Sequence, residues 1–178
     1  RYFSNTSWLM LEKVLRMVVG LLVSVWVARY LGPSDFGLFS YAQSFVALFV
    51  IFSTLGLDGI IVRELLKDDS KRDVLLGTAF ILKLLGAIIV LAVVMISVQL
   101  TSNDQLTKIL VFIIASAVVF KSFNVIDFYF QSKVLSKYVV LANSIGLFIS
   151  SLIKIILILT ESSLVYFALV VLIDSIIL

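Results

Sequence analysis

The sequence contains no cysteine and no histidine. Without cysteine there is no disulfide framework, no thiolate metal site and no cysteine nucleophile. Without histidine the usual general base at neutral pH and the commonest metal ligand are missing, and a Ser-His-Asp hydrolase is excluded. We therefore expect a protein that is not an enzyme, with no catalytic residues, no metal site and no cofactor.

Charge is also scarce, since 14% of the 178 residues are charged while 62% are hydrophobic. Soluble domains carry about 25% charged and roughly 45–50% apolar residues. A chain of this length must still cover a large surface with polar groups, so a soluble globular domain is excluded, and so is a disordered chain. The formal net charge of +3 is spread between apolar runs. It forms no clustered basic patch, so we expect no nucleic-acid partner.

The chain instead contains six apolar segments, and most of them reach the roughly 20 residues needed to cross a hydrocarbon core of about 30 Å. Their approximate ranges are 7–31, 36–66, 74–100, 106–130, 138–159 and 163–178. Residues 84–98 are apolar almost without interruption, whereas the strands of a membrane barrel alternate apolar and polar residues. Helices also satisfy their own backbone groups in lipid. The pattern predicts an all-α, polytopic membrane bundle.

Both ends of the sequence indicate a fragment of a longer protein. The first residue is Arg1, and the segment 163–178 is still apolar where the sequence stops. We expect this last segment to be a truncated helix.

The distribution of lysine and arginine between the segments predicts the orientation in the membrane. If the N-terminus is cytoplasmic, the inner side receives seven basic residues, namely Arg1, Arg63, Lys67, Lys71, Arg72, Lys133 and Lys137. The outer side then receives two, Arg29 and Lys108. The excess favours a cytoplasmic N-terminus.

Several ionisable residues fall inside the apolar segments, where a charge at the helix centre costs about 2.5–3.5 kcal/mol on insertion scales. Counting 1.5 Å per residue places Arg16, Lys83 and Asp174 near mid-membrane. Glu12, Lys121 and Lys154 are expected nearer an interface. Polar residues share one face on several segments, which predicts a common polar cavity. Four bases against two acids favour a cationic interior that suits an anionic substrate.

Structural roles remain open for some of these residues. Lys121 and Lys154 are long enough to extend to the nearer interface. Glu12 and Arg16 have the i,i+4 spacing of a helix ion pair, which needs no ligand.

Three motifs carry a resemblance to a known family. They are Val27–Pro33 with Phe36-Gly37-Leu38 and Tyr41, Gly56-Leu57-Asp58 with Arg63-Glu64, and Asp127–Lys133 with Ser136-Lys137-Tyr138. The turn at Gly32 and Pro33 also has a physical reason, because glycine permits a tight helix exit and proline cannot continue the helix. The sequence resembles the bacterial O-antigen and lipid-linked oligosaccharide flippases of the multidrug/oligosaccharidyl-lipid/polysaccharide exporter superfamily.

The resemblance implies the N-terminal lobe, residues 1–178, of a two-lobed exporter in the bacterial inner membrane, with a cytoplasmic N-terminus. Such proteins move oligosaccharides on undecaprenyl pyrophosphate to the periplasmic leaflet by alternating access, for O-antigen, lipopolysaccharide or other surface polysaccharide. The expected partners are the lipid-linked oligosaccharide, membrane lipids and a polysaccharide polymerase.

Within this function the buried charges receive two kinds of role. The candidates for binding the anionic headgroup are Arg16, Lys83, Lys121 and Lys154, chosen from their depth and sign. The candidates for coupling transport to a proton or sodium gradient are Glu12 and Asp174. The lobe by itself is not expected to transport, because half of the cavity would be missing.

Two other functions remain open. A cation-coupled multidrug exporter would need an acidic cavity, and the excess of bases argues against it. A non-transporting membrane scaffold would tolerate neutralisation of all the buried charges together.

Overall fold

The computed structural model describes residues 2–54, 56–67, 69–101, 103–133 and 136–177, and these residues form helices and turns with no strand. The helices are α1 (Tyr2–Thr54), α2 (Leu57–Lys67), α3 (Arg72–Leu100), α4 (Gln105–Phe120), α5 (Val125–Ser132), α6 (Ser136–Leu159) and α7 (Leu164–Ile177). Two short 3₁₀ helices, η1 (Asp69–Lys71) and η2 (Lys121–Asn124), precede α3 and α5. The all-α prediction is confirmed.

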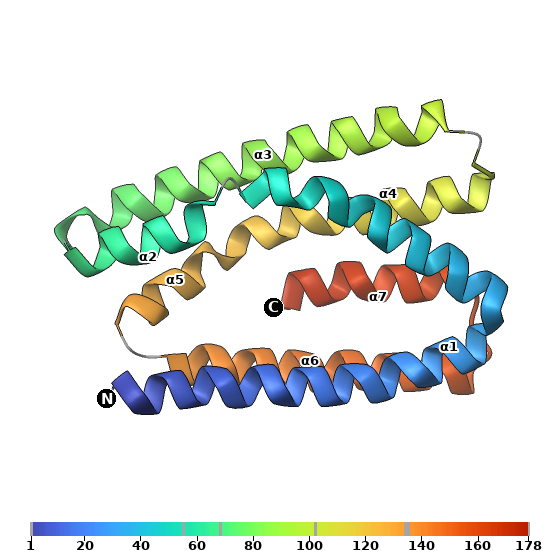
Figure 1. Cartoon of the computed structure of the whole chain (residues 1–178), viewed down its shortest axis with the longest axis horizontal. Helices are drawn as coiled ribbons and strands as arrows, with labels where there is room; N and C mark the ends of the chain where they lie inside the picture. Colours follow the sequence, from blue (N-terminus) through green and yellow to red (C-terminus); the bar gives the residue numbers. More distant parts are fainter. Residues whose placement is uncertain (1, 55, 68, 102, 134–135, 178) are drawn as a thin grey trace.

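Helix α1 is 53 residues long but is kinked at Gly32, whose φ of 72° and ψ of 174° are not helical. A positive φ is easily adopted only by glycine, and Pro33 follows directly. The kink divides α1 into a first arm (2–31) and a second arm (33–54). Figure 1 shows the first arm alongside α6, while the second arm crosses to α3 and α4. The expected boundary between the first two segments is therefore a sharp turn between two helical arms.

The other segment boundaries differ in detail from the prediction. The segment expected over 36–66 is interrupted, because α1 ends at Thr54 and α2 begins at Leu57, with Gly56 at φ 65° between them. The segment expected over 106–130 is the continuous run of α4, η2 and α5. Four stretches are long and apolar enough to cross a membrane, 10–51, 72–100, 105–132 and 137–159, and the first of these contains the kink. Helix α7 is apolar but shorter.

The main core lies where the second arm, α3, α4 and α7 meet. Ala42, Val94, Leu110 and Phe167 are almost completely buried there. A smaller cluster joins α2, α3 and α5 through Ile61, Leu65, Ala79, Val125 and Phe128. The outward faces of the same helices expose leucine, isoleucine and valine side chains. Apolar residues on both sides are expected where a bundle is surrounded by lipid.

Polar contacts anchor the end of the bundle that contains the kink. The hydroxyl of Tyr30 donates to the carbonyl of Ser162 at 3.0 Å, and its ring lies 5.8 Å from that of Phe167. The amide of Asn103 donates to the hydroxyl of Tyr41 at 3.3 Å. The α6–α7 turn and the α3–α4 loop are thus tied to the two sides of the kink.

Candidate functional site

A cavity of about 270 Å³ lies where the end of the second arm and the start of α2 meet α3 and the α4–α5 junction. We call it the charged cavity. Its polar lining consists of Ser53, Asp58, Lys83, Lys121, Ser122, Asn124, Asp127 and Gln131. Apolar residues such as Val50, Ala87 and Phe128 complete it. A polar cavity inside an otherwise apolar bundle is a candidate binding site.

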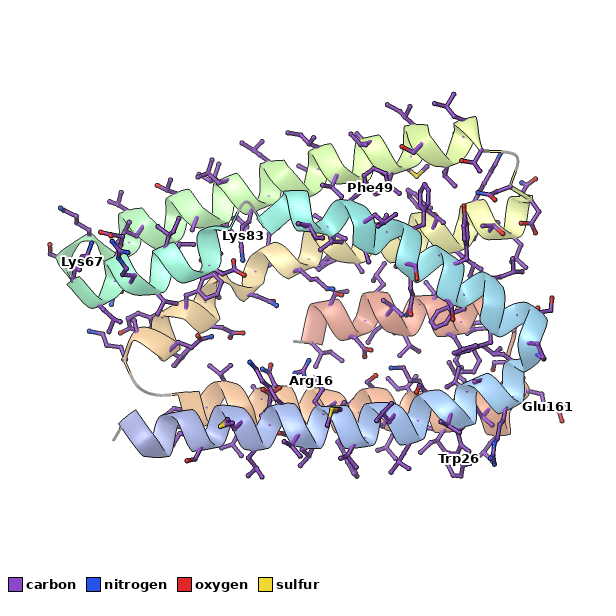
Figure 2. All side chains as sticks on the ribbon, viewed as in Figure 1. Arg16, Trp26, Phe49, Lys67, Lys83 and Glu161 are labelled. Atoms are coloured by element: carbon purple, nitrogen blue, oxygen red, sulfur yellow. The ribbon has the colours of Figure 1, made fainter. Side chains whose placement is uncertain are left out.

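Lys83 is the most buried charged residue in the described part of the chain, with 7% of its surface exposed. Its ammonium lies 2.7 Å from Oδ1 of Asp58 and 4.5 Å from the ring centre of Phe128. Figure 2 shows the side chain pointing from α3 into the space between α2 and α5. A buried charge is tolerated when it is paired, and an aromatic face adds electrostatic attraction. The Asp58 carboxylate and the Phe128 ring therefore compensate for the burial of the Lys83 side chain.

The local sequence explains how this pair forms. Lys83 lies on the buried stripe of α3, with Ala79 and Ala87 one turn before and after it. These small neighbours leave room for the long side chain. Asp58 is in the first turn of α2, where the helix dipole favours a carboxylate. The interruption at Gly56 starts α2 at this point, so the helix break places Asp58 against Lys83.

Lys121 supplies a second cation to the charged cavity. It begins η2, the short 3₁₀ helix between α4 and α5, and it is exposed. Within the described ranges its ammonium has no hydrogen-bond or ion-pair partner. Unlike Lys83, it is free to meet a ligand.

The α5 side of the charged cavity carries further available polar groups. Asn124, Asp127 and Gln131 follow one another at helical spacing and all line the cavity. Their side chains make no hydrogen bond to any residue that the structure describes. Two lysines and two aspartates leave the cavity with no formal net charge, whereas four bases and two acids were expected within the segments.

Arg16 and Glu12 form an ion pair on the first arm. Nη2 of Arg16 lies 2.8 Å from Oε1 of Glu12, and Nε donates to the same oxygen at 3.0 Å. Figure 2 shows Arg16 pointing toward the side of the molecule on which α5 and α7 lie. Glu12 lies within electrostatic range of Asp127. Neither residue of the pair lines the charged cavity.

Lys154 and Asp174 form an ion pair outside the charged cavity. Their side chains join α6 to α7, with Nζ of Lys154 donating to Oδ2 of Asp174 at 3.2 Å. Lys154 also borders a second cavity of about 200 Å³, whose polar lining includes Ser24, Gln43 and Ser151. Oδ1 of Asp174 is buried and accepts no hydrogen bond from the described residues. A residue predicted to bind the headgroup is thus paired with one predicted to couple an ion.

The structure accordingly brings together two of the four predicted headgroup residues, Lys83 and Lys121. It places Arg16 and Lys154 in separate ion pairs. Sequence reasoning did not select Asp58, Asn124, Asp127 and Gln131 as site residues. The helical spacing of Asn124, Asp127 and Gln131 can be recognised in the sequence. Asp58, in contrast, faces Lys83 only because the helix breaks before α2.

Within the described ranges, no three aspartate, glutamate, histidine or cysteine side chains lie close enough together to hold a metal ion. The available chemistry is that of ammonium, carboxylate and amide groups. Such a set can bind and release a polar or anionic group, and it can take up and release protons.

Comparison with protein families gives one match. The model of the family described as "Polysaccharide biosynthesis protein" matches residues 3–178. Members of that family are typically transporters rather than enzymes. No curated protein and no solved structure matches the chain. The matched range includes every helix that borders the charged cavity.

Proposed function

Because the chain belongs to the polysaccharide biosynthesis protein family, in which a role in polysaccharide export or flipping is supported, we propose that this multi-pass membrane protein is a lipid-linked oligosaccharide flippase. It moves oligosaccharide repeat units on undecaprenyl pyrophosphate across the bacterial inner membrane by alternating access. The translocated repeat units are used to build O-antigen, lipopolysaccharide or another surface polysaccharide. The observation that carries the proposal is a polar cavity with a buried lysine inside an apolar helical bundle.

The pyrophosphate is the part of this substrate that the charged cavity suits best. A diphosphate needs cations at depth, and Lys83 lies 11 residues into α3, about 17 Å along a helix with 1.5 Å rise per residue. That is near the middle of a hydrocarbon core of about 30 Å. The cavity of about 270 Å³ lies below the range of roughly 300–1,000 Å³ for pockets that enclose whole ligands. The sugars would therefore extend beyond it, while the polyprenyl chain stays in lipid.

The two lysines would bind the pyrophosphate in different ways. Lys121 has no partner in the described structure and would bind a phosphate directly. Lys83 is already paired with Asp58, so the phosphate would compete with that carboxylate. Asn124 and Gln131 would donate to phosphate or sugar oxygens. Binding would thus exchange an internal ion pair for a pair with the substrate.

Cells expressing the intact protein as their only flippase would test this role. Lys83→Gln and Lys121→Gln are each expected to lower surface polysaccharide by about tenfold, equivalent to about 1.4 kcal/mol of lost binding. Lys108→Gln is the matched control, because Lys108 contacts Gln99 away from the charged cavity. Normal polymer in both cavity variants, at normal protein levels, would contradict the proposal.

Arg16 and Lys154 would meet the headgroup at later stages of its passage, and their partners Glu12 and Asp174 would couple transport to a proton or sodium gradient. Binding of the ion to either carboxylate would weaken its ion pair and release the base. Glu12→Gln and Asp174→Asn are therefore expected to transport at a rate independent of the gradient, measured with an uncoupler in vesicles. Unchanged sensitivity to the uncoupler in both variants would exclude this assignment.

In the same proposal residues 1–178 form the N-terminal lobe of the exporter, with the N-terminus in the cytoplasm. A polysaccharide polymerase would use the translocated repeat units on the far side of the membrane. The lobe alone is expected not to transport in reconstituted vesicles.

A multidrug exporter is a second candidate because Asp58 and Asp127 also line the charged cavity, and carboxylates suit cationic drugs. Drug susceptibility of cells with and without the intact protein separates the two. A flippase leaves susceptibility unchanged and restores polymer.

A further inference from the structure

An apolar groove lies between the end of the first arm and the end of α6, close to the kink. Its volume is about 390 Å³. Its lining consists of Trp26, Arg29, Tyr30, Ile155, Ile158 and Leu159. In Figure 1 this region is at the opposite end of the bundle from the α2–α3 turn. None of these residues belongs to the charged cavity, so the groove is a separate feature.

The two walls of the groove are built in the same way. Residues 26, 29 and 30 on α1 and residues 155, 158 and 159 on α6 each follow the i, i+3, i+4 spacing of one helix face. The hydroxyl of Tyr30 donates a hydrogen bond to the carbonyl of Ser162 at 3.0 Å, and this bond holds the Tyr30 ring in place. The groove is thus formed before any ligand arrives.

The openings of the groove face the surroundings of the bundle. Trp26 is 55% exposed and Leu159 is 77% exposed. Figure 2 shows Trp26 pointing outward from the first arm. Because α1 and α6 are apolar enough to cross a membrane, an apolar chain can enter from the lipid side.

Arg29 is the only charged residue among those lining the groove. It is exposed and has no hydrogen-bond or ion-pair partner within the described ranges. A guanidinium binds phosphate oxygens through two parallel hydrogen bonds. Tryptophan and tyrosine favour the headgroup level of a membrane. The groove therefore combines a phosphate donor with an apolar slot at one membrane surface.

We propose that this groove binds one phospholipid of the adjacent leaflet, with its phosphate on Arg29 and one acyl chain between Trp26 and α6. The charge of Arg29 favours a phosphate, and the apolar walls favour a ligand that carries an acyl chain. The site is independent of the transport proposal and of the orientation of the chain.

Native mass spectrometry of the full chain in detergent, titrated with phosphatidylglycerol, would test the site. Arg29→Gln removes the phosphate donor, and Ile155→Trp fills the slot while Arg29 stays intact. Each is expected to weaken binding of one lipid by about tenfold, which corresponds to about 1.4 kcal/mol. Lys108→Gln is the control, since Lys108 is a cation in the first turn of α4, beside the α3–α4 loop, and does not line the groove. It should bind as the unaltered chain does.

Circular dichroism would establish that both groove variants keep their helix content. Equal lipid binding by folded Arg29→Gln and Ile155→Trp would overturn the site. Displacement of phosphatidylglycerol by an equimolar amount of undecaprenyl phosphate would overturn the assignment to a phospholipid. Retention of phosphatidylglycerol in that competition supports it.

Discussion

An ammonium group placed near the centre of a membrane costs about 2.5–3.5 kcal/mol on insertion scales, and Lys83 offsets that cost with specific neighbours. The carboxylate of Asp58 lies 2.7 Å away, and the ring of Phe128 lies against the ammonium. Asp58 is half exposed, whereas the side chain of Lys83 is 9% exposed. The lysine therefore depends on the aspartate more than the aspartate depends on the lysine.

This asymmetry leads to a prediction about stability. Asp58→Asn should destabilise the protein by about 3–5 kcal/mol, because it leaves a buried charge without its partner. The double variant Lys83→Gln/Asp58→Asn should recover most of that loss, since neither charge remains. Thermal unfolding in detergent measures both effects. A double variant as unstable as Asp58→Asn would refute the ion-pair explanation.

The same double variant also separates binding from structure. If Lys83 binds the pyrophosphate, the double variant should be stable yet keep the roughly tenfold loss of polymer expected for Lys83→Gln. If the pair is only structural, activity should return together with stability.

At the scale of the helices, the charged cavity depends on how closely α3 approaches the end of α1. A Cβ atom added at Gly86 would lie 3.0 Å from the backbone carbonyl oxygen of Ser53. Ser53 lines the charged cavity, and Gly86 is one turn after Lys83 on α3. Small residues commonly allow this kind of approach between membrane helices. The contact therefore sets the width of the cavity at its α1 side.

Gly86→Ala is expected to destabilise the protein by about 1–3 kcal/mol, because the backbone of Ser53 must move. Gly77→Ala is the matched control on the same helix, since a Cβ atom there would meet nothing within 4 Å. Alanine is favoured over glycine within a helix by about 1 kcal/mol, so the control should be slightly stabilised. Melting temperatures of the two variants should move in opposite directions, and a rise for both would contradict the close approach.

At the scale of the whole molecule, the bundle has two ends that differ in structure. One end carries the α2–α3 turn, and the other carries the kink together with the α3–α4 loop and the α6–α7 turn (Figure 1). The excess of basic residues at the first end favours its location in the cytoplasm. Alternating access would have to open the charged cavity, which borders α2, toward that side first.

This orientation can be tested directly, because residues 1–178 contain no cysteine and a thiol introduced there is unique within them. Ser70→Cys, near the α2–α3 turn, is expected to react with a membrane-impermeant maleimide only after the inner membrane is permeabilised. Glu161→Cys, in the α6–α7 turn, is exposed at the opposite end and should react in intact spheroplasts. The reverse pattern would show that the N-terminus is outside.

The sequence by itself determined the class of the fold and the positions of its main turns. Apolar runs of about 20 residues can satisfy their backbone groups in lipid only as helices, so hydropathy was enough to predict the bundle. The kink at Gly32 was also predictable, because glycine and proline act on the local backbone. These features depend on residues that are neighbours in the chain.

Only the tertiary structure decided which charges meet. Asp58 contacts Lys83 because α2 begins after Gly56 and packs beside α3, and Lys154 meets Asp174 across two different helices. Such contacts depend on the rotation and spacing of whole helices, which hydropathy does not specify. Depth and sign selected four candidate headgroup residues, of which Lys83 and Lys121 line one cavity. The carboxylates beside these two lysines became apparent only once the helices were packed.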